Sequence, residues 1–157
     1  ILAGDENPCL FLLENLQDPG NMGTILRTSE GAGVSGIIMN RESVDPYNPK
    51  VIRSTMGAIF RMPFVIVDDF EDVLCRLKEA GVRTFAAHLD GEDFYRQDYR
   101  GGCAFFIGNE GNGLSEELAA RADGRIRIPM KGQVESLNAA VAATVLMYET
   151  LRQREWV

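Results

Sequence analysis

Three short segments of the chain combine polar side chains, glycines and turn-forming residues in ways that could serve ligand chemistry. The first contains the turn sequence Asp18-Pro19-Gly20-Asn21, and either Asn21 or Thr24 is expected to cap the helix that follows. Arg27 comes about one turn further into that helix. A guanidinium at the mouth of a sheet can bind a phosphate or stabilise developing negative charge, although a plain exposed helix arginine fits the same pattern.

The second segment, residues 108–114, has three glycines in six positions, between an apolar run and a helix start at Ser115. Glycines in such a loop let the backbone approach a ligand closely. Their order is G-x-x-G-x-G and no phosphate-binding lysine follows, which disfavours a nicotinamide-dependent oxidoreductase and a P-loop. Glu110 stands between the glycines, where a plain turn would favour Asn or Asp.

The third segment, residues 128–141, joins the last apolar run to a C-terminal helical pattern. Pro129 is expected to end a strand, and Ser136 is expected to cap the helix. Asn138 is a weak helix former within the first turn. Its polar end is expected to point toward the same group of loops.

The elements that must position these segments alternate along the chain. Six short apolar runs predict strands, and all but the last are nearly continuous, as in strands covered on both faces. They lie at residues 10–13, 36–39, 64–67, 84–87, 104–107 and 126–128. Apolar residues at helical spacing predict helices over residues 70–80 and 137–151. The pattern predicts an α/β domain with a mainly parallel sheet, where ligands bind at the carboxyl ends of the strands.

At this level the chain resembles the SPOUT superfamily, in its SpoU/TrmH branch of RNA ribose 2′-O-methyltransferases. The residues that carry the resemblance form three motifs, in order, over about residues 10–152. They are Asn15, Asp18-Pro19, Asn21, Gly23 and Arg27-Thr28 in the first motif; Gly108, Glu110-Gly111 and Gly113-Leu114 in the second; and Ile128-Pro129-Met130 with Ser136-Leu137-Asn138 in the third.

The resemblance implies a fold, a cofactor and a set of site residues. It implies a deep trefoil knot near the C-terminus, which nothing in the periodicity indicates, and S-adenosylmethionine bound by the last two motifs. The expected cofactor-binding residues are Gly108, Ile128 and Leu137, with Ile107, Asn109, Met130 and Ala87 beside them. The expected catalytic residues are Arg27, Asn21, Glu110, Ser136 and Asn138. Since an arginine is a poor base, we favour phosphate binding or alkoxide stabilisation for Arg27.

The resemblance also implies partners. We expect a homodimer, in which Arg27 reaches toward the cofactor of the other subunit, and the candidate interface elements are the helix over residues 137–151 and the helix of the first motif. The expected substrate is RNA, with ribosomal RNA favoured over transfer RNA. A tRNA 2′-O-methyltransferase and a non-catalytic RNA-binding module of the same fold remain as alternatives.

The remaining candidate groups favour simpler roles. His88, the single histidine, is expected to be a hydrogen-bonded residue at the end of a strand that borders the cofactor pocket, and no metal site is expected. The three cysteines Cys9, Cys75 and Cys103 have neither disulfide nor zinc spacing, so reduced thiols in a cytoplasmic protein fit best. No apolar run is long enough for a membrane span.

Length and charge set the remaining expectations. The 157 residues suit one domain, residues 1–157, and the start at Ile1 without a methionine suggests a longer protein whose N-terminal RNA-binding domain is absent from this chain. The net charge of −7 argues against nucleic acid at first sight. However, the acids concentrate in residues 1–19 and 62–98, whereas residues 20–61 are net basic and rich in arginine.

Overall fold

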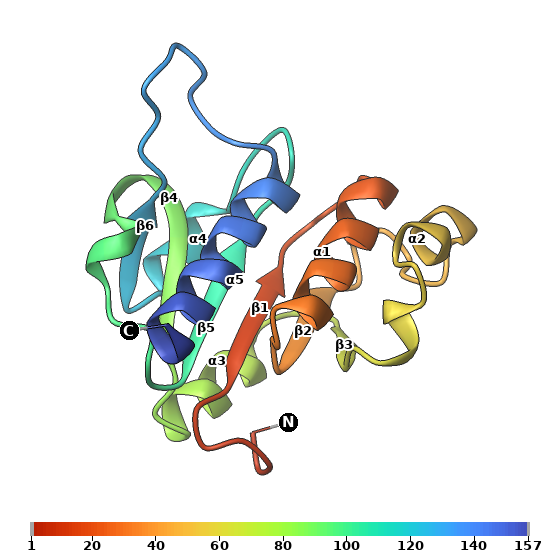
Figure 1. Ribbon diagram of the computed structural model, residues 1–157, viewed down its shortest axis with the longest axis horizontal. Helices are drawn as coiled ribbons and strands as arrows, with labels where there is room; N and C mark the ends of the chain where they lie inside the picture. The colour runs from red at the N-terminus through yellow and green to blue at the C-terminus, as the bar shows by residue number, and fades with distance from the viewer. Residues whose placement is uncertain (1, 157) are drawn as a thin grey trace.

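The structure is a computed structural model that describes residues 2–156, and its frame is one six-stranded parallel sheet (Figure 1). Ile1 and Val157 lie outside the described residues. The strands are β1 (Cys9–Leu13), β2 (Gly36–Asn40), β3 (Phe64–Val67), β4 (Arg83–Asp93), β5 (Cys103–Ile107) and β6 (Gly124–Arg127). The helices are α1 (Pro19–Gly31), α2 (Pro49–Ser54), α3 (Glu71–Glu79), α4 (Glu116–Ala120) and α5 (Ala139–Glu155), with short 3₁₀ turns η1 (Ala58–Phe60) and η2 (Phe94–Arg96).

The strand order β3-β2-β1-β5-β4-β6 explains which loops meet. β1 and β5 are neighbours, with Leu13 beside Ile107 at their carboxyl ends. β4 and β6 are also neighbours. The loops after β1, β5, β4 and β6 therefore leave the same edge of the sheet side by side, although they are far apart in sequence.

The two faces of the sheet carry different helices. Alternate side chains of each buried strand point to opposite faces. In β1, Phe11 packs in a cluster with residues of α1 and α5, whereas Leu10 and Leu12 pack with residues of α3 and α4. We call these the α1–α5 face and the α3–α4 face. α2 packs on α1, and its Val51 belongs to the α1–α5 cluster.

β4 is longer than the sequence predicts. It continues beyond Ala87 to Asp93, through a register shift against β6 between Ala87 and Glu92. Residues 88–93 are mostly polar and have no strand pattern, so their extended form depends on pairing with β6. His88 consequently lies on an irregular part of a strand and not at its end.

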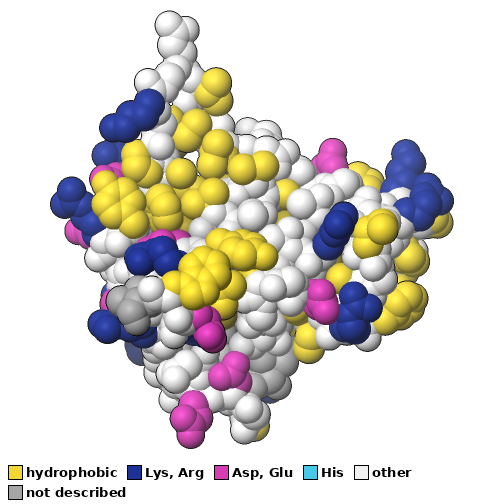
Figure 2. All heavy atoms as spheres, viewed as in Figure 1, with side chains coloured by type: hydrophobic (Ala, Val, Ile, Leu, Met, Phe, Trp, Pro, Cys, Tyr) yellow, Lys and Arg dark blue, Asp and Glu magenta, His cyan; other side chains and the backbone are white. Residues whose placement is uncertain are grey.

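The buried side of α5 also differs from the expectation. The spacing predicts a buried side with Val141 and Tyr148, but these side chains are 47% and 40% exposed. The helix instead buries Ala140, Ala143, Leu146, Met147 and Thr150. Small residues let α5 lie close to the sheet and to α1, where the Ser29 hydroxyl is 3.7 Å from the Met147 sulfur. Apolar residues therefore remain on the outer side of α5, and Figure 2 shows hydrophobic side chains along it.

Two expectations are confirmed and two stay open. The α/β class with a parallel sheet is confirmed, and α3 matches the helix predicted over residues 70–80. The trefoil knot and the N-terminal RNA-binding domain stay predictions. Within residues 2–156, no helix is long and apolar enough to cross a membrane.

Candidate functional site at the carboxyl edge of the sheet

Glu110 ties the loop after β5 to the loop after β1. Its carboxylate accepts hydrogen bonds from the backbone N–H groups of Gln17 and Asp18. The distance is 2.7 Å from Gln17 to Oε1 and 2.7 Å from Asp18 to Oε2. A second tie comes from Asn109, whose Nδ2 donates to the Asn15 carbonyl at 2.8 Å. Asn15 has a positive φ of 53°, which asparagine tolerates better than most residues. The two loops therefore form one unit, which explains the glutamate between two glycines.

The loop after β5 is held by hydrogen bonds within its own backbone. These bonds give Gly108 a structural reason besides the expected approach to a ligand. Asn109 and Gly113 exchange backbone hydrogen bonds of 2.8 and 3.1 Å. A Cβ at Gly108 would lie 2.2 Å from the Leu114 nitrogen and 2.3 Å from the Gly113 carbonyl carbon. The loop's own backbone therefore requires glycine here, whether or not a ligand approaches.

The cap expected for α1 is wrong, and as a result the side chain of Asn21 is available for another contact. Asp18 caps α1, because its Oδ1 accepts from the Asn21 N–H at 2.9 Å and Pro19 follows in the first turn. Neither Asn21 nor Thr24 is the cap. The Asn21 side chain is left to accept a 3.0 Å hydrogen bond from Asn138 Nδ2.

The cap of α5 is also displaced. Asn138 caps the helix, with its Oδ1 accepting from the N–H groups of Ala140 and Val141 at 2.8 and 3.2 Å. The expected cap, Ser136, precedes the helix and is exposed, and its hydroxyl has no hydrogen-bond partner among residues 2–156. Asn138 thus uses its carbonyl to begin α5 and its amide to hold Asn21.

Hydrogen bonds therefore connect all three segments in one relay. Glu110 holds the backbone at Asp18, the Asp18 side chain holds the backbone of Asn21, and the Asn21 side chain holds Asn138. The first link joins the loop after β5 to the loop after β1, the second is the cap within the start of α1, and the third joins α1 to α5. The relay fixes the beginning of α1 against the beginning of α5.

Arg27 stands outside this relay. Its side chain is exposed on α1 and makes no hydrogen bond or ion pair with any other described residue. One turn before it, Gly23 lies so close to α2 that a Cβ there would be 2.1 Å from Ser54 Cβ. Because residues four apart share a side of a helix, Arg27 projects along the border between α1 and α2.

A pocket of about 330 Å³ lies on the α1–α5 face beside the relay. Its lining comes from residues 87–89 within β4, from the ends of β5 and β6 with the loops that follow them, and from the start of α5. Of the expected cofactor-binding residues, six line it: Ala87, Ile107, Gly108, Asn109, Ile128 and Leu137. Met130 does not line it, because the chain leaves the sheet edge after Ile128. Of the expected catalytic residues, Glu110 and Ser136 line it, whereas Arg27, Asn21 and Asn138 do not.

Several lining residues were not predicted from the sequence. Leu114, Ala139, Ala142 and Leu146 all contribute to the wall. The run Ala139-Ala140 directly after Asn138 could have signalled a helix start that comes close to a ligand. Ala142 and Leu146 could not be assigned, since the spacing pointed to the opposite side of α5.

His88 lines the pocket with both ring nitrogens engaged. Nδ1 accepts from the Asp90 N–H at 3.2 Å, so Nε2 carries the proton and donates to Glu116 Oε1 at 3.0 Å. This hydrogen bond, with the nearby Arg125, holds the pKa of the Glu116 carboxyl below its usual value of 4.5. The histidine joins a strand to α4, so neither nitrogen is free to take a proton from a substrate.

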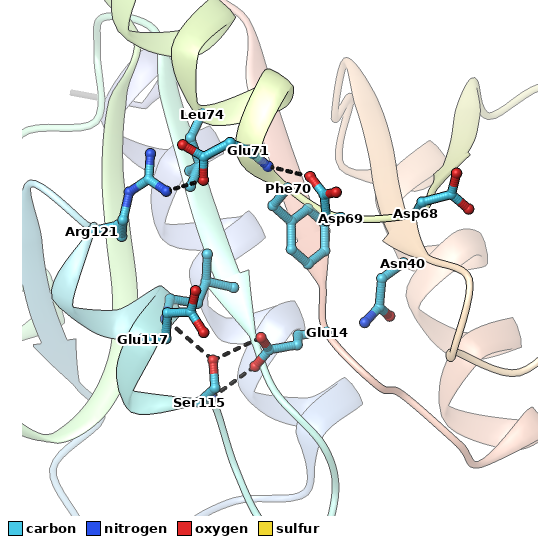
Figure 3. Close-up of a pocket in the computed structure, with 11 residues that line it drawn as sticks. Glu14, Asn40, Asp68, Asp69, Phe70, Glu71, Leu74, Ser115, Glu117 and Arg121 are labelled. Carbon is cyan, nitrogen blue, oxygen red and sulfur yellow. Dashed lines mark hydrogen bonds and ion pairs between the residues drawn. The ribbon is translucent and has the colours of Figure 1, made fainter.

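A second pocket, of about 480 Å³, opens on the α3–α4 face (Figure 3). Glu14 is held there by the backbone N–H and the hydroxyl of Ser115, at 2.7 and 2.8 Å, and Arg121 pairs with Glu71. Its charged lining consists of Glu14, Asp68, Asp69, Glu71 and Glu117 against Arg121 alone. So many carboxylates would repel phosphates. Across residues 2–156 there is no group of three side chains placed to hold a metal ion.

Comparison with known proteins gives a consistent result. Residues 8–148 match the profile of the SpoU rRNA methylase family. The 23S rRNA (guanosine(2553)-2′-O)-methyltransferase RlmP of Bacillus subtilis is 34% identical over 140 residues, which cover 88% of this chain and 56% of that protein.

Two solved structures extend the match to three dimensions. The SpoU methyltransferase AviRb from Streptomyces viridochromogenes, in complex with AdoMet, has a TM-score of 0.90 and 33% identity over 96% of this chain and 59% of that chain. The A. aeolicus TrmH/SpoU tRNA modifying enzyme has a TM-score of 0.86 and 28% identity over 97% of this chain and 77% of that chain. The chain spans about three fifths of the length of the curated relatives it matches.

Proposed function

The chain belongs to the SpoU rRNA methylase family, and on that premise we propose that it transfers a methyl group from S-adenosylmethionine to a ribose 2′-hydroxyl of RNA. The observation that carries the proposal is the relay from Glu110 through Asp18 and Asn21 to Asn138, next to a pocket lined by β4 and by the loops after β5 and β6. It brings the three resemblance motifs together at one place.

The pocket fits S-adenosylmethionine in its chemistry. Ile107, Ile128 and Leu137 offer aliphatic surface for an adenine ring. The two basic side chains of the lining are already engaged, His88 with Glu116 and Arg127 with Asp93. The lining therefore presents no uncompensated positive charge, which suits a cationic sulfonium. When bound, S-adenosylmethionine supplies a methyl group that an oxygen nucleophile can displace from sulfur.

The protein's first task is alignment. An in-line displacement needs the attacking oxygen, the methyl carbon and the sulfur on one axis, and fixed geometry lowers the barrier. The relay provides rigidity for this, because it locks the start of α1 to the start of α5. Glu110, Asn21 and Asn138 are thus positioning residues in the proposal. Ser136, whose hydroxyl lines the pocket, is available to orient the ribose or the cofactor.

Arg27 is assigned the electrostatic task. An arginine side chain keeps its proton, so it serves poorly as a base, but its fork of N–H donors suits a phosphate or a developing alkoxide. We assign it to the phosphate or to the 2′-oxygen of the target nucleotide. Since Arg27 does not line the pocket of its own chain, the arginine that serves a pocket comes from a second copy.

A homodimer follows from that assignment. The outer side of α5, with Val141 and Tyr148, offers an apolar surface beside α1. We expect sedimentation to give a dimer. Mixing Arg27→Ala with the pocket variant Leu137→Asp should restore activity that neither has alone, because a mixed dimer keeps one complete site. A fully active monomer would contradict the shared site.

Ribosomal RNA is the proposed substrate, with transfer RNA as the second candidate. The family description and the name of RlmP favour ribosomal RNA, whereas the A. aeolicus structure is named for tRNA modification. We propose cytoplasmic action, in keeping with three cysteines that are free thiols. The alternative of an RNA-binding protein that does not methylate its RNA is distinguished from the enzyme by an assay of methyl transfer.

Two measurements test the proposed function. Calorimetric titration should show binding of S-adenosylmethionine and none of NAD, and the reverse result would favour an oxidoreductase. Incubation of radiolabelled S-adenosylmethionine with unmodified ribosomal RNA or transfer RNA should label the ribosomal RNA. Labelling of transfer RNA alone would correct the substrate, and cofactor binding without labelling of either RNA would favour a non-catalytic module.

A further inference from the structure

A basic stretch without acids follows the second strand. Residues 49–67 contain Lys50, Arg53 and Arg61 and no Asp or Glu, in a chain whose net charge is −7. They form α2, η1 and β3. We use the name α2 surface for Lys50, Arg53, Met56, Phe60 and Arg61.

Two large apolar side chains of the α2 surface face solvent. Phe60 is 84% exposed and Met56 is 70% exposed, whereas Ala58 and Ile59 between them are buried. Met56 has a φ of 51° and Gly57 a φ of 87°, so the chain turns through two left-handed residues between α2 and η1. Such a conformation is costly for methionine and is found most often at functional sites.

Two of the three cations of the α2 surface have no carboxylate partner among the described residues. Lys50 and Arg53 are exposed, and neither side chain makes an ion pair or a hydrogen bond with another residue in the described part of the chain. Arg61 pairs with Glu30 at 2.9 Å. Most other arginines are neutralised by carboxylates: Arg41, Arg76, Arg100, Arg121, Arg125, Arg127 and Arg152.

The α2 surface lies on the same side of the molecule as the relay. α2 packs against α1 at Gly23, and Arg27 follows one turn along that border. Figure 1 shows α2 beside α1, and Figure 2 shows Lys or Arg side chains next to hydrophobic ones on that part of the molecule. A strand of RNA bound at Arg27 would therefore be within reach of this surface.

We propose that the α2 surface binds the single-stranded RNA that flanks the target ribose, with Phe60 stacking on a base and Lys50 and Arg53 binding phosphates. Exposed aromatic side chains interleaved with cations are the usual means of holding single strands. A protein-binding patch would not require the free positive charge. This inference rests on the proposed function and extends it to the region of RNA beside the reacting nucleotide.

The test is fluorescence anisotropy with a short fluorescein-labelled oligouridylate at low salt, where phosphate contacts are strongest. Phe60→Ala and Phe60→Leu should both weaken binding about tenfold, because both remove the stacking ring. Arg53→Gln should lower the slope of log affinity against log salt by about one. Lys78→Gln is the matched control, since Lys78 is also an exposed cation in the last turn of a helix, on α3, and should change neither quantity.

The outcomes separate this inference from the proposed function. Calorimetry with S-adenosylmethionine in each variant reports on the pocket and should show unchanged affinity. If the Phe60 and Arg53 variants bound RNA as tightly as the wild-type protein does, the role proposed for the α2 surface would be wrong and the proposed function would be unaffected. Binding retained by Phe60→Leu and lost by Phe60→Ala, with a change in oligomeric state, would identify a protein contact instead. Wild-type protein that neither binds RNA nor methylates it would overturn both.

Discussion

The two faces of the sheet carry pockets of opposite character at the same edge. The α1–α5 face has the smaller pocket, lined mainly by aliphatic side chains and loop backbone, and the exposed Arg27, Lys50 and Arg53 belong to α1 and α2, which do not line it. The α3–α4 face has the larger pocket, with five carboxylates and a single arginine that is already paired. Pocket volume does not say which of them suits a substrate that carries phosphates. The charge around each pocket separates them.

The difference in charge between the two faces explains how a chain of negative net charge could bind RNA. The acids predicted to concentrate in residues 62–98 include Asp68, Asp69 and Glu71, which line the α3–α4 pocket. The net-basic residues 20–61 form α1, α2 and η1 on the other side. Net charge therefore averages two surfaces that would act oppositely on RNA. If the chain acts on RNA as proposed, a repulsive far face would also direct the RNA to the face that holds the relay.

The largest expected effect is a loss of methyl transfer when the guanidinium group of Arg27 is replaced. Arg27→Lys keeps the charge and removes the planar set of donors, so turnover should fall about a hundredfold, with unchanged affinity for S-adenosylmethionine. Single-turnover methylation and calorimetry measure the two quantities. The control is Arg76→Lys on the α3–α4 face, which should be silent because Arg76 is exposed and pairs only with Asp72. Near-normal turnover of Arg27→Lys would contradict the role.

The next effect compares one glutamate from each pocket. Glu110→Gln weakens charge-assisted hydrogen bonds to the N–H groups of Gln17 and Asp18, so we expect kcat to fall about tenfold as the loop after β1 loosens. Glu117→Gln, from the α3–α4 pocket, should leave kcat unchanged. Equal effects of the two substitutions on steady-state methylation would remove the distinction between the faces.

A smaller effect concerns stability. Gly108→Ala places a methyl group against the backbone of Gly113 and Leu114, and overpacking of this kind costs about 2 kcal/mol in the free energy of unfolding. Gly132→Ala is its control within the loop after β6, since a Cβ there meets nothing within 4 Å. Urea unfolding compares them. A Gly108→Ala protein as stable as Gly132→Ala would show that the loop after β5 is more open than described.

The smallest effect concerns the contact that links the two faces. The hydrogen bond from His88 lowers the pKa of the Glu116 carboxyl below its usual value of 4.5. The ionised carboxyl therefore stabilises the fold fully at pH values above 4.5, and this stability is lost as the pH falls through the lowered pKa. In His88→Leu, carbon NMR of the Glu116 carboxyl should show the pKa rising toward 4.5. An unchanged pKa would mean that Arg125 alone sets it.

The strands and α3 could be predicted because their signals are local. Continuous apolar runs mark strands covered on both faces, and Leu74 and Leu77 fall at helical spacing. The end of β4 could not be predicted, because residues 88–93 become extended only through pairing with β6. The buried side of α5 was also beyond reach, since apolar residues occur on more than one side of the helix.

The site could be predicted in its residues but not in its contacts. Asn21, Glu110 and Asn138 stood out as polar residues in turn-rich segments. The bonds of Glu110 to Gln17 and Asp18 depend on β1 and β5 being neighbours, which no local pattern reveals. The cap of α1 lies three residues before Asn21, the nearer of its two expected caps, and the cap of α5 lies two residues after Ser136, because several neighbouring polar side chains could serve. The path of the chain into the helix selects among them.

The most direct measurement locates the methyl group itself. RNA incubated with the protein and S-adenosylmethionine would be digested to nucleosides and analysed by mass spectrometry, with Arg27→Lys in parallel. The account predicts a nucleoside methylated on its ribose 2′-oxygen with the wild-type protein and strongly reduced product with the variant. A methyl group on the base, or product that does not depend on Arg27, would contradict it.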